Sequence, residues 1–105
     1  MNTGQIRIAL AQINPTVGDL AANADLVSKY AFEAANAGAV VVVYPEMILT
    51  GYPVEDLATR ASFRAASINA INNLAKRIND EGNGDLTLLV GYLGESEKGE
   101  PQNCV

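Results

Sequence analysis

The fold class of this chain follows from one stretch of sequence, Ala39-Val40-Val41-Val42-Val43-Tyr44-Pro45-Glu46. Its β-branched residues predict a strand over residues 39–44, and Pro45 ends that strand because proline cannot donate a hydrogen bond to a sheet. An apolar run without polar alternation is typical of a strand buried on both faces, as in parallel sheets that helices cover. The run therefore indicates an α/β fold.

The segments around this run alternate between strand patterns and helix patterns. In chain order we expect a strand over residues 5–12, a helix over 19–37, the strand over 39–44, a helix over 62–80 and a strand over 86–92. The loop over residues 46–59 is long, and a polar turn over residues 94–102 precedes a further strand that opens at Asn103. A strand–helix–strand order predicts a parallel sheet with right-handed crossovers.

Length and composition exclude several classes of protein. The chain has 105 residues, one ordinary domain at most, and its 49% hydrophobic and 18% charged residues are typical of a globular protein. Seven basic residues against 12 acidic ones give a net charge of −5, which argues against a nucleic-acid or anionic-membrane partner. With no histidine, the chain can form no Ser-His or Cys-His pair and no zinc site of the usual kind.

The single cysteine and the apolar runs predict a cellular location. One cysteine forms no internal disulfide, which fits a reducing compartment. The longest apolar run, residues 37–44, is too short to span a bilayer, and the N-terminus lacks the basic-then-apolar pattern of a signal peptide. We expect a cytoplasmic protein with no metal site in this segment.

Glu46 is the candidate catalytic residue. It directly follows the predicted strand over residues 39–44, and ligands of open α/β sheets bind beyond the carboxyl ends of the strands. A carboxylate beside valines is expected to be partly desolvated, and desolvation in general suits a carboxyl group to act as a base near neutral pH. The alternative is a solvated loop residue or a helix-capping acid.

Two sequence blocks carry a resemblance to a known family. The block Ile8-Ala9-Leu10-Ala11-Gln12-Ile13-Asn14-Pro15-Thr16-Val17-Gly18-Asp19-Leu20, with Asn23 after it, resembles the first strand and turn of the nitrilase, or carbon–nitrogen hydrolase, superfamily. The block from Tyr44 to Leu57 resembles the glutamate signature of the same superfamily. The resemblance implies that residues 1–105 form part of a four-layer α-β-β-α sandwich, and it makes a homo-oligomer the expected state.

A narrower resemblance comes from the loop Gly51-Tyr52-Pro53-Val54-Glu55-Asp56-Leu57, which looks like that of the glutaminase domains of glutamine-dependent NAD synthetases. It implies that the chain is the N-terminal portion of one glutaminase domain in a longer enzyme. That enzyme would take ammonia from glutamine and, with ATP and Mg²⁺ in a second domain, amidate nicotinic acid adenine dinucleotide to NAD. We expect no cofactor in the present segment.

The family's mechanism implies a role for Glu46. Enzymes of this superfamily use a cysteine thiolate to attack the amide carbon, a glutamate to accept and return the proton, and a lysine to stabilise the oxyanion. The glutamate corresponds to Glu46. Lys76, Lys98 and Cys104 do not stand in the family's lysine and cysteine contexts, so the segment alone should be inactive. Cys104 is expected to be a small buried hydrophobic residue.

Tyr52 is the second candidate site residue. The resemblance assigns it to the glutamine-binding pocket, and the alternative is a loop aromatic that packs beneath Pro53. Asp19 and Asn23 are expected to cap a helix and brace a loop.

Four further charged residues lie just before the second predicted helix or in its first turn. We expect Glu55 and Asp56 to cap the short turn that follows them, with contacts to a partner domain or subunit as the alternative. Arg60 and Arg64 are expected on a solvated face, with a subunit contact as the alternative.

Two other functions stay open at the level of the sequence. A stand-alone aliphatic amidase would use the same chemistry without a synthetase domain. A non-enzymatic α/β binding module would make Glu46 incidental, and it would have to tolerate the unpaired strand edge of an incomplete sheet.

Overall fold

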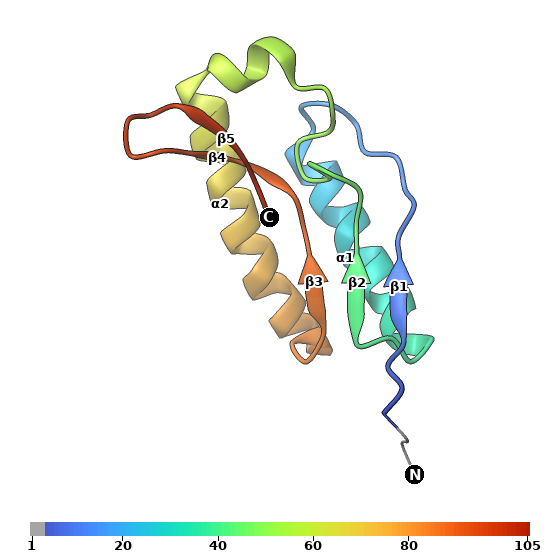
Figure 1. The fold of residues 1–105 in the computed structure, drawn as a ribbon. Helices are drawn as coiled ribbons and strands as arrows, with labels where there is room; N and C mark the ends of the chain where they lie inside the picture. Colours follow the sequence, from blue (N-terminus) through green and yellow to red (C-terminus); the bar gives the residue numbers. More distant parts are fainter. Residues whose placement is uncertain (1–3) are drawn as a thin grey trace.

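The computed structural model describes residues 4–105, and Figure 1 shows strands alternating with helices through most of the chain and a hairpin at its end. The elements are β1 (Ile8–Leu10), α1 (Leu20–Asn36), β2 (Val41–Val43), a 3₁₀ helix (Glu55–Thr59), α2 (Ala61–Ile78), a π-helical turn (Asn79–Asn83), β3 (Thr87–Leu89), β4 (Tyr92–Glu95) and β5 (Pro101–Cys104). Both long helices lie close to their predicted bounds, and the predicted α/β fold class is confirmed.

The first three strands form a parallel sheet in the order β1-β2-β3. Their register aligns three rows of residues, which are Ile8, Val41 and Thr87, then Ala9, Val42 and Leu88, then Leu10, Val43 and Leu89. Because side chains alternate along a strand, the middle row points to one face of the sheet and the two outer rows point to the other.

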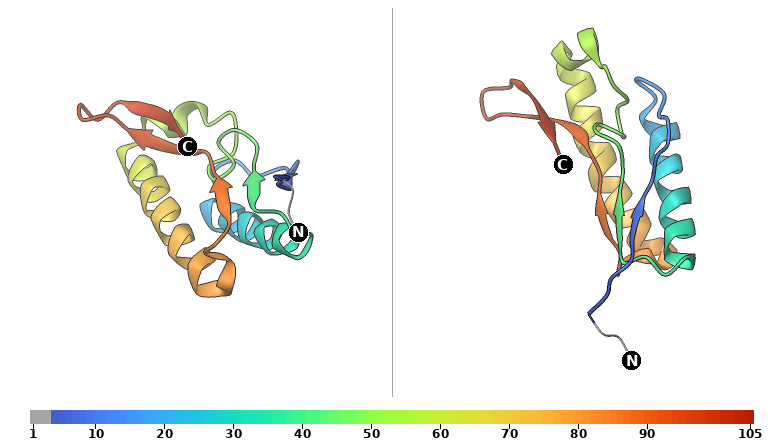
Figure 2. Two further views of the ribbon diagram at one scale, coloured as in Figure 1. Left: turned by 60° about the horizontal axis from the view of Figure 1, so that its bottom comes forward. Right: turned by 45° about the vertical axis from the view of Figure 1, so that its right-hand side comes forward.

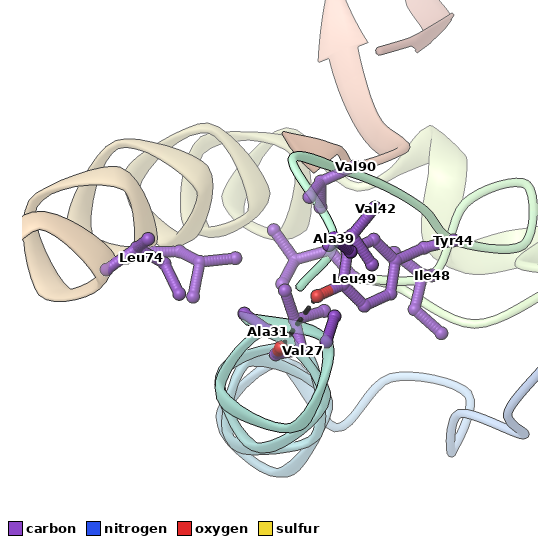
Figure 3. Packing of buried hydrophobic residues seen from close by; sticks show 11 residues of the cluster. Val27, Ala31, Ala39, Val42, Tyr44, Ile48, Leu49, Leu74 and Val90 are labelled. Atoms are coloured by element: carbon purple, nitrogen blue, oxygen red, sulfur yellow. Dashed lines mark hydrogen bonds between the residues drawn. The ribbon is translucent and has the colours of Figure 1, made fainter. Parts of the chain in front are cut away.

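Helices α1 and α2 lie on the same side of the sheet (Figures 1 and 2). The core forms between them and the middle row, around Val27 and Val42, which are both fully buried. Figure 3 shows how side chains from α1, α2, β2 and the loop after β2 meet there. The Tyr44 hydroxyl donates to the Val27 carbonyl at 2.8 Å, which satisfies a polar group inside this core.

The opposite face of the sheet is largely exposed. Leu10 is 69% exposed, and Ile8 and Leu89 are each more than 40% exposed. Val41 and Val43 are only half-buried. The prediction that the strand over residues 39–44 is buried on both faces is therefore wrong for the structure of residues 4–105. Helices α1 and α2 cover the same face of the sheet and leave the other face open.

The predicted strand over residues 86–92 is two strands in different sheets. The chain leaves the parallel sheet after Leu89, and Tyr92 begins β4, which pairs antiparallel with β5. Gly91 lies at the break, where an added Cβ atom would be 2.5 Å from the Met47 backbone nitrogen. This close approach to the loop after β2 requires glycine and turns the chain out of the parallel sheet.

Three other boundaries differ from the predictions. β1 is shorter than the predicted strand over residues 5–12, and the loop over residues 46–59 contains the 3₁₀ helix. β5 begins at Pro101 rather than Asn103, because the Ser96 hydroxyl accepts hydrogen bonds from two backbone N–H groups and closes a tight turn that brings the chain back early. No helix within residues 4–105 is long and apolar enough to cross a membrane.

Candidate active site

The loop after β2 sets the position of Glu46. Pro45 ends the strand, and residues 46–50 form a tight turn in which the backbone N–H groups of Thr50 and Gly51 donate to the Met47 carbonyl. The turn buries Met47 and the three residues after it, and the Leu49 N–H donates to the Gly91 carbonyl at 3.2 Å. Glu46 is thus the exposed residue at the start of a firmly held turn.

The Glu46 carboxylate is exposed and has a partner from the hairpin. Its Oε1 accepts a hydrogen bond from Asn103 Nδ2 of β5 at 2.5 Å. The prediction that Glu46 is partly desolvated is wrong for the structure of residues 4–105. The turn buries the four side chains that follow Glu46 and leaves Glu46 itself exposed. Glu46 does not line the hollow of about 440 Å³ between α1 and α2. Residues of the two helices line it, among them Leu20, Ala70 and Arg77.

Asn23 braces the loops on both sides of the site. Its side chain is 1% exposed, its Nδ2 donates to the carbonyls of Thr16 and Leu49, and its Oδ1 accepts from the Thr16 N–H, all at 2.8–2.9 Å. Asp19 caps α1 by accepting from the Ala22 N–H at 3.0 Å. Both predicted structural roles are confirmed.

The same two loops also touch through their backbones. The Gly18 N–H donates to the Thr50 carbonyl at 2.8 Å, and an added Cβ atom on Gly51 would lie 2.6 Å from Val17 Cα. Gly51 also has a φ of +80°, which favours glycine. The turn that carries Glu46 is therefore fixed to the loop after β1 as well as to Gly91.

Tyr52 lies on the same loop and is 65% exposed. A ring that packed beneath Pro53 would be largely covered, so the exposure does not favour the packing alternative. Glu55 and Asp56 lie in the first turn of the 3₁₀ helix, where a negative charge is favoured, but that helix has Val54 at its N-cap and no side-chain cap hydrogen bond. The predicted capping hydrogen bonds are absent from this helix.

Arg64 is a buried structural residue, and the prediction that it lies on a solvated face is wrong. Its side chain is only 9% exposed, its Nε donates to Glu95 Oε1 at 2.8 Å, and its Nη1 donates to the Ala58 carbonyl at 2.9 Å. The contact with β4 buries it, so the predicted solvated face holds only for Arg60, which is exposed.

The lysines and the cysteine of the sequence analysis lie on separate elements. Lys76 is in the last turn of α2, Lys98 is in the turn between β4 and β5, and half-buried Cys104 packs its Sγ against Gly94. Within residues 4–105 no three His, Cys, Asp or Glu side chains cluster in a way that could hold a metal ion.

Asn103 is the site residue that sequence reasoning missed. The sequence marks it only as the opening of a strand, and it is 57 positions away from Glu46. Only the pairing of β5 with β4 brings its side chain to the carboxylate, and a hairpin register of this kind is not visible in a local pattern.

The chain is similar to enzymes of known type. The family model described as carbon-nitrogen hydrolase matches residues 7–101. The glutamine-dependent NAD(+) synthetase of Rhodobacter capsulatus is 44% identical over 78 residues, which cover 74% of this chain and 14% of that protein. The solved glutamine-dependent NAD(+) synthetase from Cytophaga hutchinsonii has a TM-score of 0.81 at 28% identity, covering 94% of this chain and 16% of that one. A solved amidase from Nesterenkonia sp. has a TM-score of 0.72 at 26% identity, covering 90% of this chain and 34% of that one.

These similarities confirm the resemblance found in the sequence, both to carbon–nitrogen hydrolases and to glutamine-dependent NAD synthetases. They also show that this α/β arrangement is the one such enzymes use. The chain spans only 14–16% of the length of the two synthetases. Because the family model matches nearly all of its residues, the chain belongs to the carbon-nitrogen hydrolase family.

Proposed function

We propose that residues 1–105 form the N-terminal part of a glutaminase domain in a longer enzyme, and that this domain releases ammonia from glutamine. The observation that carries the proposal is Glu46, which follows the central strand of a carbon-nitrogen hydrolase domain and is held there by the turn and by Asn103. Relatives named glutamine-dependent NAD(+) synthetase support glutamine as the substrate.

In this proposal Glu46 accepts the proton of a cysteine thiol, and the thiolate attacks the amide carbon of glutamine. The same carboxyl group returns the proton to the departing nitrogen, so that ammonia leaves and a thioester remains. Water then attacks the thioester while Glu46 takes a proton from that water, and the C–S bond breaks to release glutamate. Glu46 passes the proton to the departing sulfur, which restores the thiol and the carboxylate. A lysine would stabilise the oxyanion, and the lysine and cysteine would come from other parts of the protein.

Tyr52 is proposed to line the glutamine pocket. Its exposed ring lies six residues after Glu46 on the same braced loop, so it can offer an apolar surface to the substrate's methylene groups. Because Glu46 lies at an open surface, the remaining walls of the pocket must come from further residues of the protein.

We further propose that the ammonia serves the ATP-dependent amidation of nicotinic acid adenine dinucleotide to NAD. ATP and Mg²⁺ would bind in a separate synthetase domain. The enzyme would be a cytoplasmic homo-oligomer, and residues 1–105 alone would release no ammonia from glutamine.

Glu46→Gln in the full-length protein tests the proposed role of Glu46. The substitution removes the proton acceptor and keeps the shape of the side chain, so ammonia release should fall by about 100-fold to 10,000-fold. Glu33→Gln changes an exposed glutamate of α1 and should leave the rate unchanged. Wild-type turnover in Glu46→Gln would exclude Glu46 as the proton acceptor.

A stand-alone amidase is the second candidate function, and the similarity to the solved Nesterenkonia amidase favours it. The two functions differ in their products. A synthetase forms NAD from nicotinic acid adenine dinucleotide, ATP and glutamine, whereas an amidase hydrolyses short aliphatic amides and consumes no ATP. Purified full-length protein assayed on both substrate sets distinguishes them.

A further inference from the structure

Asn103 brings an amide group from β5 to the carboxylate of Glu46. A carboxylate only accepts hydrogen bonds, so the nitrogen of the amide must face it. No other side chain within residues 4–105 forms a hydrogen bond or ion pair with Glu46. We propose that Asn103 is a positioning residue that holds Glu46 in the orientation required for proton transfer, and this inference rests on the proposed function.

Both partners of this hydrogen bond are anchored to the core. Glu46 starts the turn whose Leu49 N–H donates to Gly91. Asn103 is paired with Leu93 of β4, and the Leu93 N–H donates to Ser67 Oγ, which is fully buried on α2. The distance between the two side chains is therefore set by packed elements, although the hydrogen bond itself lies at the surface.

A partner that fixes the orientation of an exposed glutamate makes it more effective in proton transfer. Its side chain has several rotatable bonds, and holding it in one rotamer costs free energy unless a contact offsets the loss of freedom. A proton acceptor must point at the group that it deprotonates, because proton transfer works only within hydrogen-bond reach. The Asn103 contact supplies this fixed orientation.

The geometry also leaves Glu46 able to accept a proton. Asn103 occupies Oε1, and Oε2 has no hydrogen-bond partner within the part of the chain that the structure describes. A neutral amide orients the carboxylate through one oxygen without forming an ion pair with it. Asn103 can therefore fix the acceptor and keep it available.

The test compares variants of the full-length protein by steady-state ammonia release from glutamine. Asn103→Leu removes the donor at similar volume, and we expect kcat to fall about 10-fold to 100-fold with KM little changed. Asn103→Gln keeps an amide and should recover most of the lost kcat. Gln102→Leu is the matched control, because Gln102 is the exposed amide next to it on β5, on the opposite face of the strand. This control should keep wild-type kinetics.

Three results would overturn the inference. In the first, Asn103→Leu keeps a kcat close to that of Gln102→Leu. In the second, Asn103→Gln loses as much kcat as Asn103→Leu. In the third, the loss of kcat comes with a lower thermal midpoint, which would indicate damage to the hairpin. Glu46→Gln separates the two proposals: if it is inactive while Asn103→Leu is active, only the positioning role fails, and if it is active, the proposed function fails.

Discussion

Asn23 shows how one buried amide fixes the loops around the candidate site. Asn23→Ala removes three hydrogen bonds, and it leaves the buried Leu49 carbonyl and the part-buried backbone groups of Thr16 without these partners. Unsatisfied buried groups are costly, so we expect the free energy of unfolding to fall by about 2–4 kcal/mol. Urea unfolding of the full-length protein measures this loss.

The control for this prediction is Asn69→Ala, which changes an exposed asparagine within α2. Alanine favours helices more than asparagine does, so this variant should be unchanged or slightly more stable. Equal stability of the Asn23 and Asn69 variants would show that the bracing hydrogen bonds contribute nothing.

Tyr44 makes the stability of the domain sensitive to alkaline pH. Burial raises the pKa of its hydroxyl from 10.0 to about 12, because the charged phenolate is poorly solvated in the core. The raised pKa adds stability that is fully present below pH 10 and is lost as the pH rises through about 12, since the unfolded chain ionises first.

Tyr44→Phe should flatten this alkaline loss of stability and remove the component near pH 12 from the absorbance titration of the folded protein. The variant should also be less stable at neutral pH, because it leaves the Val27 carbonyl without the hydroxyl that donates to it. A Tyr44→Phe protein with the same pH dependence as the wild type would disprove the assignment.

For single residues, the sequence predicted the location of a residue relative to its strand or loop better than the exposure and contacts of its side chain. Glu46 follows β2 as expected, and Asn23 braces its loop as expected, because both inferences depend on residues nearby in the chain. The exposure of Glu46 and the contact with Asn103 depend on how β5 folds back from a distance. A local pattern carries no information about such a contact.

Arg64 ties three elements together. Its guanidinium joins the start of α2 to Glu95 at the end of β4 and to the Ala58 carbonyl of the 3₁₀ helix. Arg64→Met keeps the apolar stem but leaves both acceptors without this donor. We expect a loss of about 1–3 kcal/mol in the free energy of unfolding, which denaturant titration would measure.

Glu95→Gln is the matched comparison, since an amide oxygen can still accept from Arg64 Nε. Because Glu95 is 35% exposed, its charge is partly screened by solvent and this variant should lose less stability than Arg64→Met. If Arg64→Met were as stable as the wild type, the hydrogen bonds of Arg64 to Glu95 and Ala58 would contribute nothing to the free energy of unfolding.

The elements themselves were predictable to different degrees. Both helices follow from a local period of apolar residues, and the observed α1 and α2 lie close to the predicted bounds. The strand over residues 86–92 failed as one element because its break at Gly91 is set by contact with Met47, far away in the sequence. Apolar runs in the sequence indicate where strands lie, but contacts with segments far away in the sequence determine where each strand ends.

At the scale of the whole molecule the parallel sheet has one covered face and one open face. Figure 2 shows both helices on the same side, and the opposite face presents Ile8, Leu10 and Leu89 to solvent. A contiguous apolar patch of this kind marks an interaction surface. This open face supports the proposal that residues 1–105 are part of a larger domain.

The open face gives a prediction that contrasts the isolated segment with the full-length protein. Residues 1–105 alone should self-associate, and Leu10→Lys should raise the fraction of monomer in sedimentation velocity because it places a charge on the apolar patch. In the full-length protein the same substitution should cost about 2 kcal/mol or more of stability, because a further layer would bury the lysine.

Ala22→Lys controls for the added charge, since it introduces the same residue at an exposed position of α1. It should not change the association of the segment, and it should cost the full-length protein less than about 1 kcal/mol, the usual effect of a positive charge in the first turn of a helix. If Leu10→Lys left the full-length protein as stable as Ala22→Lys does, the face would stay open in the whole molecule. The sheet would then be complete without a second layer, and the four-layer arrangement implied by the sequence resemblance would not apply to this protein.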